Sequence, residues 1–316
     1  MSRPILVAVI AHLGGLVALA LAPYFLLPGP LDTLGRILFY ALLAASLNLL
    51  VGLTGLPSLG HAAYFAVGGY TAGLLAKHVT TGGPAQFGAA MVAGGLVAAL
   101  TGWLAVRSRG VYFLMLTLAI GQTVAVLALT WEEVTLGSNG LYGIPAVRAV
   151  PGGEPVIAAA DVYWYTLAGF VVGYLLLWLV WASPFGMALR GIRDNESRMR
   201  AIGYPTVWYK YAVFCAAGAV AGAAGSLLSA HERLVTPADA GFETAVVALL
   251  AVVIGGTRSL WGPCIGTAIV ILVRDTIGAQ LEGHGPLLLG LVFIAVVYLL
   301  PRGVSGFQRP AWARRA

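Results

Sequence analysis

The residues most able to contact a solute are polar side chains in otherwise apolar sequence. Ser46 and Asn48 lie within a long apolar stretch, and His61 follows a segment rich in glycine and proline. Polar groups are costly in lipid, so each of them either bonds a neighbouring helix or faces a polar path through the protein. Both interpretations stay open at this point. The candidate residues of such a path are Ser46, Asn48, Gly55, Pro57, Ser58, Gly60, His61 and Gln122.

Two glycine-rich breaks interrupt the apolar sequence, at residues 52–60 and 255–263. Glycine and proline at this density favour either a tight turn or a segment that re-enters the membrane. A helix that starts near Ser58 would direct its positive N-terminal end at an anionic group such as a carboxylate. Interrupted apolar segments in both halves of a transporter indicate a central solute site.

The longest run of charged residues lies in the middle of the chain, within residues 183–208. Ser183 followed by Pro184 predicts a helix start, and Gly203 with Pro205 predicts a helix end. Short amphipathic helices of this kind lie on a membrane surface or dock in a groove on a soluble subunit, and their pattern does not separate the two.

No enzyme motif stands out. The sequence lacks the phosphate-binding pattern G-x-x-x-x-G-K-[ST], the zinc motif H-E-x-x-H and the nucleophile turn G-x-S-x-G. The five histidines have no metal-ligand spacing. We therefore expect a chain that is not an enzyme, has no catalytic residues and binds no metal or cofactor of its own.

The composition predicts a protein that lies in a membrane. Hydrophobic residues make up 59% of the 316 positions and charged residues 9%, against about 25% charged residues in a typical soluble domain. We expect an all-α fold, with one transmembrane domain over residues 1–316 that has about 8–10 spans and discontinuous or re-entrant segments. The predicted spans are residues 5–27, 34–54, 59–78, 86–106, 111–130, 162–182, 209–230, 243–256, 263–281 and 285–301.

Positive charge is distributed unevenly between alternate loops. The net charge of +6 comes from residues spread over several short loops and the C-terminus, which fits the positive-inside rule and not nucleic-acid binding. This distribution predicts that both termini, the segment 183–208 and the basic tail 302–316 lie in the cytoplasm. The glycine- and proline-rich connection 131–161 is then outside.

Five segments of the chain together resemble a known family. They are similar, in the same order, to Liv-type branched-chain amino acid ABC transporter permeases, and they cover most of residues 36–305. The LivM-like member of the permease pair is a better match than the LivH-like member. The segments are 46–70 (SLNLLVGLTGLPSLGHAAYFAVGGY), 109–118, 138–140, 184–203 and 253–266.

The resemblance implies an ATP-driven importer in the inner membrane of a bacterial cell. It implies a second permease subunit, a LivH-like chain that completes a heterodimer. Two cytoplasmic ATPase subunits would hold the ATP and Mg²⁺, and a periplasmic or extracellular solute-binding protein would deliver the solute. The solute would be a branched-chain amino acid or a related small polar molecule.

The resemblance also assigns the segment 184–203 to docking on an ATPase. Here Glu196 is followed by Ser197 and Arg198, which departs from the usual glutamate-alanine-alanine pattern of importers. The residues assigned to ATPase coupling are Met187, Arg190, Gly191, Ile192, Arg193, Asp194, Glu196, Arg198 and Gly203.

The alternative function is a stand-alone secondary transporter or channel for small amino acids, urea, amides or carboxylates. Proton-coupled transporters usually keep carboxylates near the centres of their spans. This sequence has almost none there, which favours the importer.

Overall fold

The computed structural model describes residues 28–150 and 152–277, together with positions 290, 294, 303 and 304. The predicted spans 5–27 and 285–301, the two termini and the basic tail 302–316 lie almost wholly outside these described residues.

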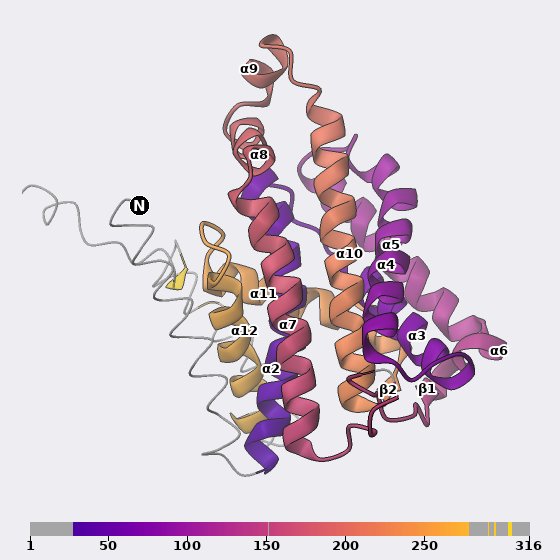
Figure 1. The fold of residues 1–316 in the computed structure, drawn as a ribbon. Coiled ribbons are helices and arrows are strands. Elements are labelled where there is room, and N and C mark those ends of the chain that lie inside the picture. Colours follow the sequence, from indigo (N-terminus) through magenta and orange to yellow (C-terminus); the bar gives the residue numbers. More distant parts are fainter. Residues whose placement is uncertain (1–27, 151, 278–289, 291–293, 295–302, 305–316) are drawn as a thin grey trace, which may run out of the picture.

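The described chain is a bundle of helices, which confirms the predicted all-α membrane fold (Figure 1). The helix α3 (His61–His78) has 18 residues and lies inside the bundle. Five other helices are long and apolar enough to cross a membrane, by length and composition. They are α2 (Pro28–Thr54, apolar from Leu31), α4 (Gly83–Ala105), α5 (Val111–Thr130), α7 (Ala159–Ala182) and α10 (Thr206–Glu232).

Two shorter helices follow α10 in the described part of the chain. They are α11 (Phe242–Gly255) and α12 (Gly262–Leu272), and a π-helical turn, η3 (Val273–Ile277), extends α12. A span needs about 20 residues, so α11 covers only part of a bilayer. The second glycine-rich break separates these two helices, as the sequence predicted.

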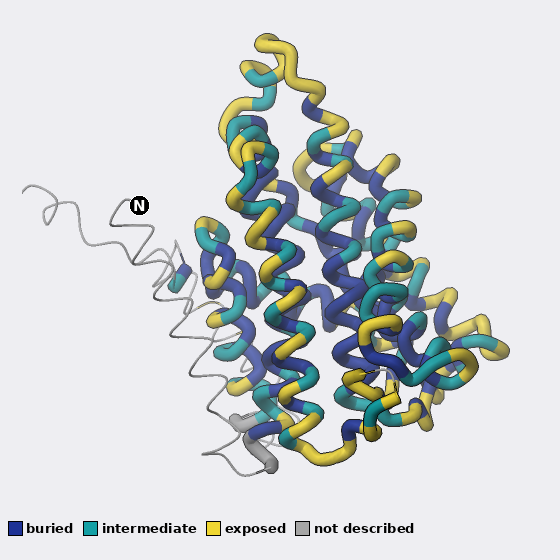
Figure 2. The backbone as a smooth tube through the Cα atoms, viewed as in Figure 1, coloured by how far each residue is buried: buried dark blue, intermediate teal, exposed yellow. Residues whose placement is uncertain are grey.

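The core of the bundle lies along α2 and α10. In the most apolar 18-residue stretch of α2, 89% of the residues are buried, and in that of α10 78% are buried. The corresponding shares for α4, α5 and α7 lie between 22% and 28%. Figure 2 shows the exposed positions of these outer helices on the surface of the bundle. The outer helices therefore offer the apolar faces that lipid or another membrane chain would cover.

Small residues let α10 approach its neighbours closely. A Cβ atom on Gly225 would lie 1.9 Å from the carbonyl oxygen of Phe65 in α3. A Cβ atom on Gly222 would lie 2.3 Å from the carbonyl oxygen of Ala90 in α4. No larger side chain fits at either position, so these glycines fix the distance between the helices.

The connection between α5 and α7 supplies one strand of the only strand pair in the described part of the chain. It begins with a short helix, α6 (Glu132–Thr135), and a 3-10 turn, η1 (Gly137–Asn139). The strand β1 (Leu141–Tyr142) then pairs antiparallel with β2 (Leu234–Val235), which follows α10. The rest of the connection is irregular, as predicted, and a further 3-10 turn, η2 (Pro237–Ala240), leads from β2 to α11.

At the opposite end of the bundle the charged segment forms two short helices, α8 (Pro184–Asp194) and α9 (Glu196–Ala201) (Figure 1). Ser183 caps α8 as predicted, because its Oγ accepts a hydrogen bond from the Gly186 N–H at 3.1 Å. Asn195 then interrupts the helix and caps α9 with its side chain, at 2.9 Å from the Arg198 nitrogen. Gly203, with φ of 95°, ends the segment in the left-handed region.

Candidate functional site

Helix α2 continues through Thr54, so the first break, predicted at residues 52–60, occupies residues 55–60, and it turns back into the bundle. Ser46 Oγ and His61 Nε2 lie 2.9 Å apart, so α3 begins beside Ser46 and not beside Thr54, where α2 ends. The stretch from Ser46 to Thr54 is about 12 Å long at the helical rise per residue. The connecting residues Ser58 and Gly60 are buried. The discontinuous segment predicted from the sequence is therefore a short re-entrant stretch between α2 and α3.

Helix α5 holds this re-entrant stretch in place through Thr117. The Leu59 N–H donates to Thr117 Oγ1 at 3.2 Å, and a Cβ atom on Gly60 would lie 2.2 Å from the carbonyl oxygen of Thr117. Thr117 is 1% exposed, whereas the predicted pathway residue Gln122 is exposed on another side of α5. The structure brings Thr117 to the break and leaves Gln122 away from it.

Helix α2 also contacts the second break. Asn48 Nδ2 donates to the Ser259 carbonyl oxygen at 2.9 Å, and a Cβ atom on Gly52 would lie 2.5 Å from the carbonyl oxygen of Thr257. Residues two positions apart on a helix point in nearly opposite directions. Ser46 and Asn48 therefore hold the two breaks on different sides of one helix, and the breaks do not form a single surface.

Two buried polar atoms at these breaks have no hydrogen-bond partner among the described residues: His61 Nδ1 and Asn48 Oδ1. The Ser46 hydroxyl donates to the Leu43 carbonyl oxygen at 2.7 Å, so its oxygen accepts from His61 Nε2. In the neutral ring this tautomer leaves Nδ1 as an acceptor. His61 Nδ1 and Asn48 Oδ1 are thus two buried acceptors that could each accept a hydrogen bond. Such a bond would be favourable, because leaving a buried polar group unpaired costs free energy.

The charged segment presents two faces. Gly186, Leu189 and Ile192 of α8 are buried, whereas Met187 and Asp194 are exposed. This agrees with the amphipathic pattern, but it places the side chain of Ile192 against its own bundle. Among the residues assigned to ATPase coupling, the structure therefore turns Ile192 away from any surface that a partner could contact.

Two further residues assigned to ATPase coupling already have contacts within this chain. Arg190 donates to the carbonyl oxygens of Gly186 and Trp181, and it lies over the Trp181 ring. A Cβ atom on Gly191 would lie 3.0 Å from the sulfur of Met199 in α9, so Gly191 lets the two short helices pack together.

The Glu196 carboxylate is surrounded by three cationic side chains and one hydroxyl group. We call these residues the Glu196 cluster: Glu196, Arg109, Arg200, Thr206 and Lys210. Lys210 Nζ lies 2.8 Å from the carboxylate, Arg200 Nη2 2.9 Å and Arg109 Nη2 3.6 Å. Partial burial alone would raise the pKa of the carboxyl, but the hydrogen bond and charge of Lys210, the charge of Arg109 and the Thr206 hydroxyl together lower this pKa. Glu196 therefore joins α9 to α10 and to the α4–α5 loop.

Arg193 reaches from α8 to the end of α2. Its Nη1 donates to the carbonyl oxygen of Gly52, and its Nη2 lies 3.1 Å from Asp194 Oδ1. A Cβ atom on Gly55, where φ is 72°, would lie 3.2 Å from Arg193 Cγ. The sequence assigned Arg193 to a partner, and it gave no signal of this contact with the first break.

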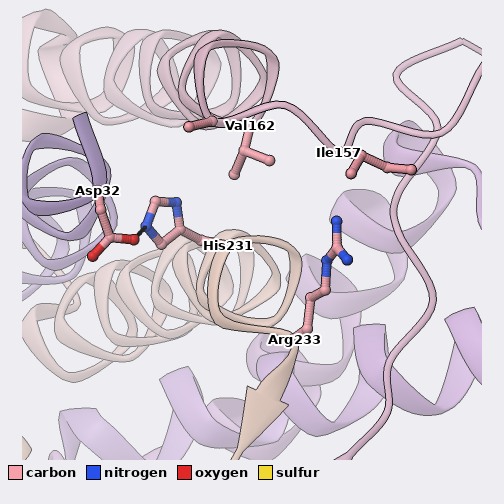
Figure 3. A pocket seen from close by; sticks show the side chains of 6 residues that line it. Asp32, Ile157, Val162, His231 and Arg233 are labelled. Carbon is pink, nitrogen blue, oxygen red and sulfur yellow. Dashed lines mark hydrogen bonds and ion pairs between the residues drawn. The ribbon is translucent and has the colours of Figure 1, made fainter. Parts of the chain in front are cut away.

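A pocket at the other end of the bundle was also not predicted (Figure 3). His231 Nε2 lies 3.1 Å from Asp32 Oδ1, and a Cβ atom on Gly35 would clash with the His231 ring. Arg233, with φ of 52°, donates to the Val156 carbonyl oxygen at 3.2 Å. The lining residues are Asp32, Ile157, Ala159, Val162, His231 and Arg233.

Interrupted helices within a bundle of membrane-spanning length are typical of multi-pass membrane transport proteins. The family described as the permease component of branched-chain amino acid transport systems matches residues 29–300. The chain belongs to this family, which confirms the resemblance found in the sequence.

Known permeases match the chain over most of its length. It is 29% identical to the high-affinity branched-chain amino acid transport system permease protein LivM of Escherichia coli strain K12, over 93% of this chain and 74% of that protein. It is 27% identical to LivM of Salmonella typhimurium, over 91% and 72%. A probable branched-chain amino acid transport permease protein LivH of Methanocaldococcus jannaschii is 27% identical, over 84% and 88%. No solved structure matches the chain.

Proposed function

We propose that this chain is the permease subunit of an ATP-driven importer, and that it forms the membrane path for branched-chain amino acids or a related small polar solute. The observation that carries this proposal is the family match over residues 29–300, which includes both breaks and the charged segment. The two LivM relatives, which cover more than nine-tenths of the chain, support the amino acid as the solute class.

The re-entrant stretch supports a path for a zwitterion. Helix α3 begins at His61 without a side-chain cap, and the first turn of a helix presents N–H groups that favour an anion. His61 Nδ1, an unused acceptor, belongs to the same residue. The carboxylate of an amino acid would bind at the helix start and its ammonium group at an acceptor such as His61 Nδ1. Ser46, Gly55, Pro57, Ser58 and Gly60 would line this path, whereas Asn48 lies on the other side of α2, at the second break.

The remaining subunits follow from the proposed role. The permease would pair with a LivH-like second permease, and an external solute-binding protein would deliver the solute. Two cytoplasmic ATPase subunits would bind ATP and Mg²⁺ and would dock on the coupling segment 183–208. Both termini and the tail 302–316 would then lie in the cytoplasm of a bacterial cell, with the chain in the inner membrane.

Reconstitution tests the proposal. The chain, its co-purifying second permease and ATPases, and the binding protein are placed in liposomes, and uptake of labelled leucine is measured with and without ATP. We expect uptake only when the ATPases and ATP are both present. Accumulation of leucine by the isolated chain under an ion gradient would identify a secondary transporter and overturn the proposal.

A further inference from the structure

The side chain of Arg193 joins the charged segment to the first break. Helix α8 packs against the end of α2, and the Arg193 guanidinium donates to the carbonyl oxygen of Gly52. The Cγ and Cδ atoms of the same side chain lie next to Gly55, the first residue of the break. Arg193 therefore touches both the last turn of α2 and the point where the chain leaves it.

The carbonyl oxygen of Gly52 is available because α2 ends two residues later. In a continuing helix it would accept from Leu56, but Gly55 adopts a φ of 72° and takes the chain out of the helix. The last carbonyl groups of a helix need partners from elsewhere, and a cation there is favoured by the helix dipole. Arg193 is thus a C-terminal cap of α2 that a different helix supplies.

The donors of Arg193 are directed within the chain. Its Nη1 is used by Gly52, and its Nε and Nη2 both lie 3.1 Å from Asp194 Oδ1. The side chain is 34% exposed, against 69% for Asp194 and 61% for the whole of Met187. Met187 and Asp194 are more exposed to a soluble subunit, whereas the Arg193 guanidinium is bonded within the chain although the residue reaches the surface.

We propose that Arg193 is a positioning residue that transmits the movement of α8 to the re-entrant stretch 55–60. When a partner displaces α8, the guanidinium moves the last turn of α2, and the backbone turns at Gly55 because glycine tolerates this conformation. The stretch between α2 and α3 then changes its position against Thr117. This inference rests on the proposed function, since it requires an ATPase that moves α8.

The first experiment compares coupling in the complete reconstituted complex for the wild type, Arg193→Gln, Arg193→Lys and Arg107→Gln. The last variant is a matched control, because Arg107 is an exposed arginine in the α4–α5 loop outside the coupling segment. The measurements are the amount of ATPase that co-purifies, the rate of ATP hydrolysis and the number of leucine molecules imported per ATP.

We expect Arg193→Gln to retain its ATPases and to hydrolyse ATP, while import per ATP falls about tenfold, within the range of coupling between two sites. Arg193→Lys recovers much of the import, since an ammonium group can also donate to Gly52, and Arg107→Gln matches the wild type. The proposal is overturned if Arg193→Gln loses its ATPases, if import per ATP is unchanged, or if Arg107→Gln falls equally.

A second measurement follows the re-entrant stretch itself. Pro57→Cys is introduced into a chain from which Cys215 and Cys264 have been removed, and its reaction with a membrane-impermeant thiol reagent is timed with and without ATP. We expect ATP to change the labelling rate with native Arg193 and to leave it unchanged with Arg193→Gln. An equal response in both would refute transmission through Arg193. Leucine uptake without ATPases would instead refute the proposed function.

Discussion

Ser46 and Asn48 lie two residues apart on α2, yet they bond different parts of the chain. Ser46 contacts the start of α3, and Asn48 contacts the loop before α12. The sequence indicated that both residues matter but left helix packing and path lining open. In the structure each side chain makes a bond between segments, and Asn48 also keeps an acceptor free. The same two residues thus hold both breaks in place.

Thr117 gives the first test at the scale of a residue. Thr117→Val keeps the shape of the side chain but leaves the buried Leu59 N–H without an acceptor, which we expect to cost about 1–3 kcal/mol. Thermal unfolding in detergent measures the loss, and leucine uptake should fall with it. Thr123→Val is the control, because Thr123 is exposed on the same helix and bonds only its own backbone neighbour Ala119. Equal effects of both variants would contradict the role of Thr117.

The Glu196 cluster gives a test of pH dependence. The pKa of the Glu196 carboxyl is lowered in the folded state. The stabilisation that Glu196 contributes is therefore present above the ordinary glutamate pKa of about 4.3 and is lost as the pH falls below it. Glu196→Gln should lower the free energy of unfolding at pH 7 by about 2 kcal/mol, the size of a charged hydrogen bond.

The difference between Glu196→Gln and the wild type should then narrow in acid. Denaturant unfolding across a pH series measures it, with Glu133→Gln as the control at an exposed carboxylate of α6. The control should stay within about 0.5 kcal/mol of the wild type. A difference that is constant from pH 7 to acid would show that the charge of Glu196 is not what stabilises the cluster.

At the scale of an element, the contact of α10 with α3 depends on the absence of side chains. Gly225→Ala places a methyl group against the Phe65 carbonyl oxygen, so the helices must separate at a cost of about 1–3 kcal/mol. Gly88→Ala on α4 is a matched control, because a Cβ atom there meets nothing within 4 Å. It should be neutral or stabilising by up to about 1 kcal/mol, given the helix propensity of alanine. The unfolding midpoints of the two variants and the wild type are compared in the same detergent. A midpoint of Gly225→Ala equal to that of Gly88→Ala would contradict the prediction.

The helix ends were predictable where local chemistry sets them. Ser183 with Pro184 began α8, and Gly203 closed the charged segment, since caps and left-handed turns depend on a few adjacent residues. The interruption at Asn195 was not predicted, because the apolar pattern continues across it and only the side-chain cap reveals it.

The rotation of each helix in the bundle was much harder to predict. On α5 the choice between Thr117 and Gln122 depends on which side meets the break, and a helix that is apolar all round gives no pattern to decide it. Arg193 is a similar case, because its bond to Gly52 depends on how α8 lies against α2, and that is a property of tertiary packing. Sequence therefore located the breaks and left their partners unknown.

At the scale of the whole molecule, the charged helices and the strand pair lie at opposite ends of the bundle (Figure 1). Met187 on α8 and Tyr142 on β1 are both exposed, at 61% and 58%. In a chain without native cysteines, we expect an impermeant thiol reagent to label Tyr142→Cys on intact cells and Met187→Cys only after the membrane is opened. The reverse labelling would contradict the orientation predicted from the arginines.

The strand pair links Leu141 with Val235 and Tyr142 with Leu234, and so joins the α5–α7 connection to the residues that follow α10. Between them, Gly152 occupies an exposed turn with nothing within 4 Å of a Cβ atom. Exposed loop tips of this kind are where proteases cut and where chains tolerate being opened. A cut in the backbone beside Gly152 would give two fragments. The pairing of β1 with β2 and the packing of the α10 glycines against α3 and α4 would still hold these fragments together. The permease could then be produced from two separate genes, each supplying one half.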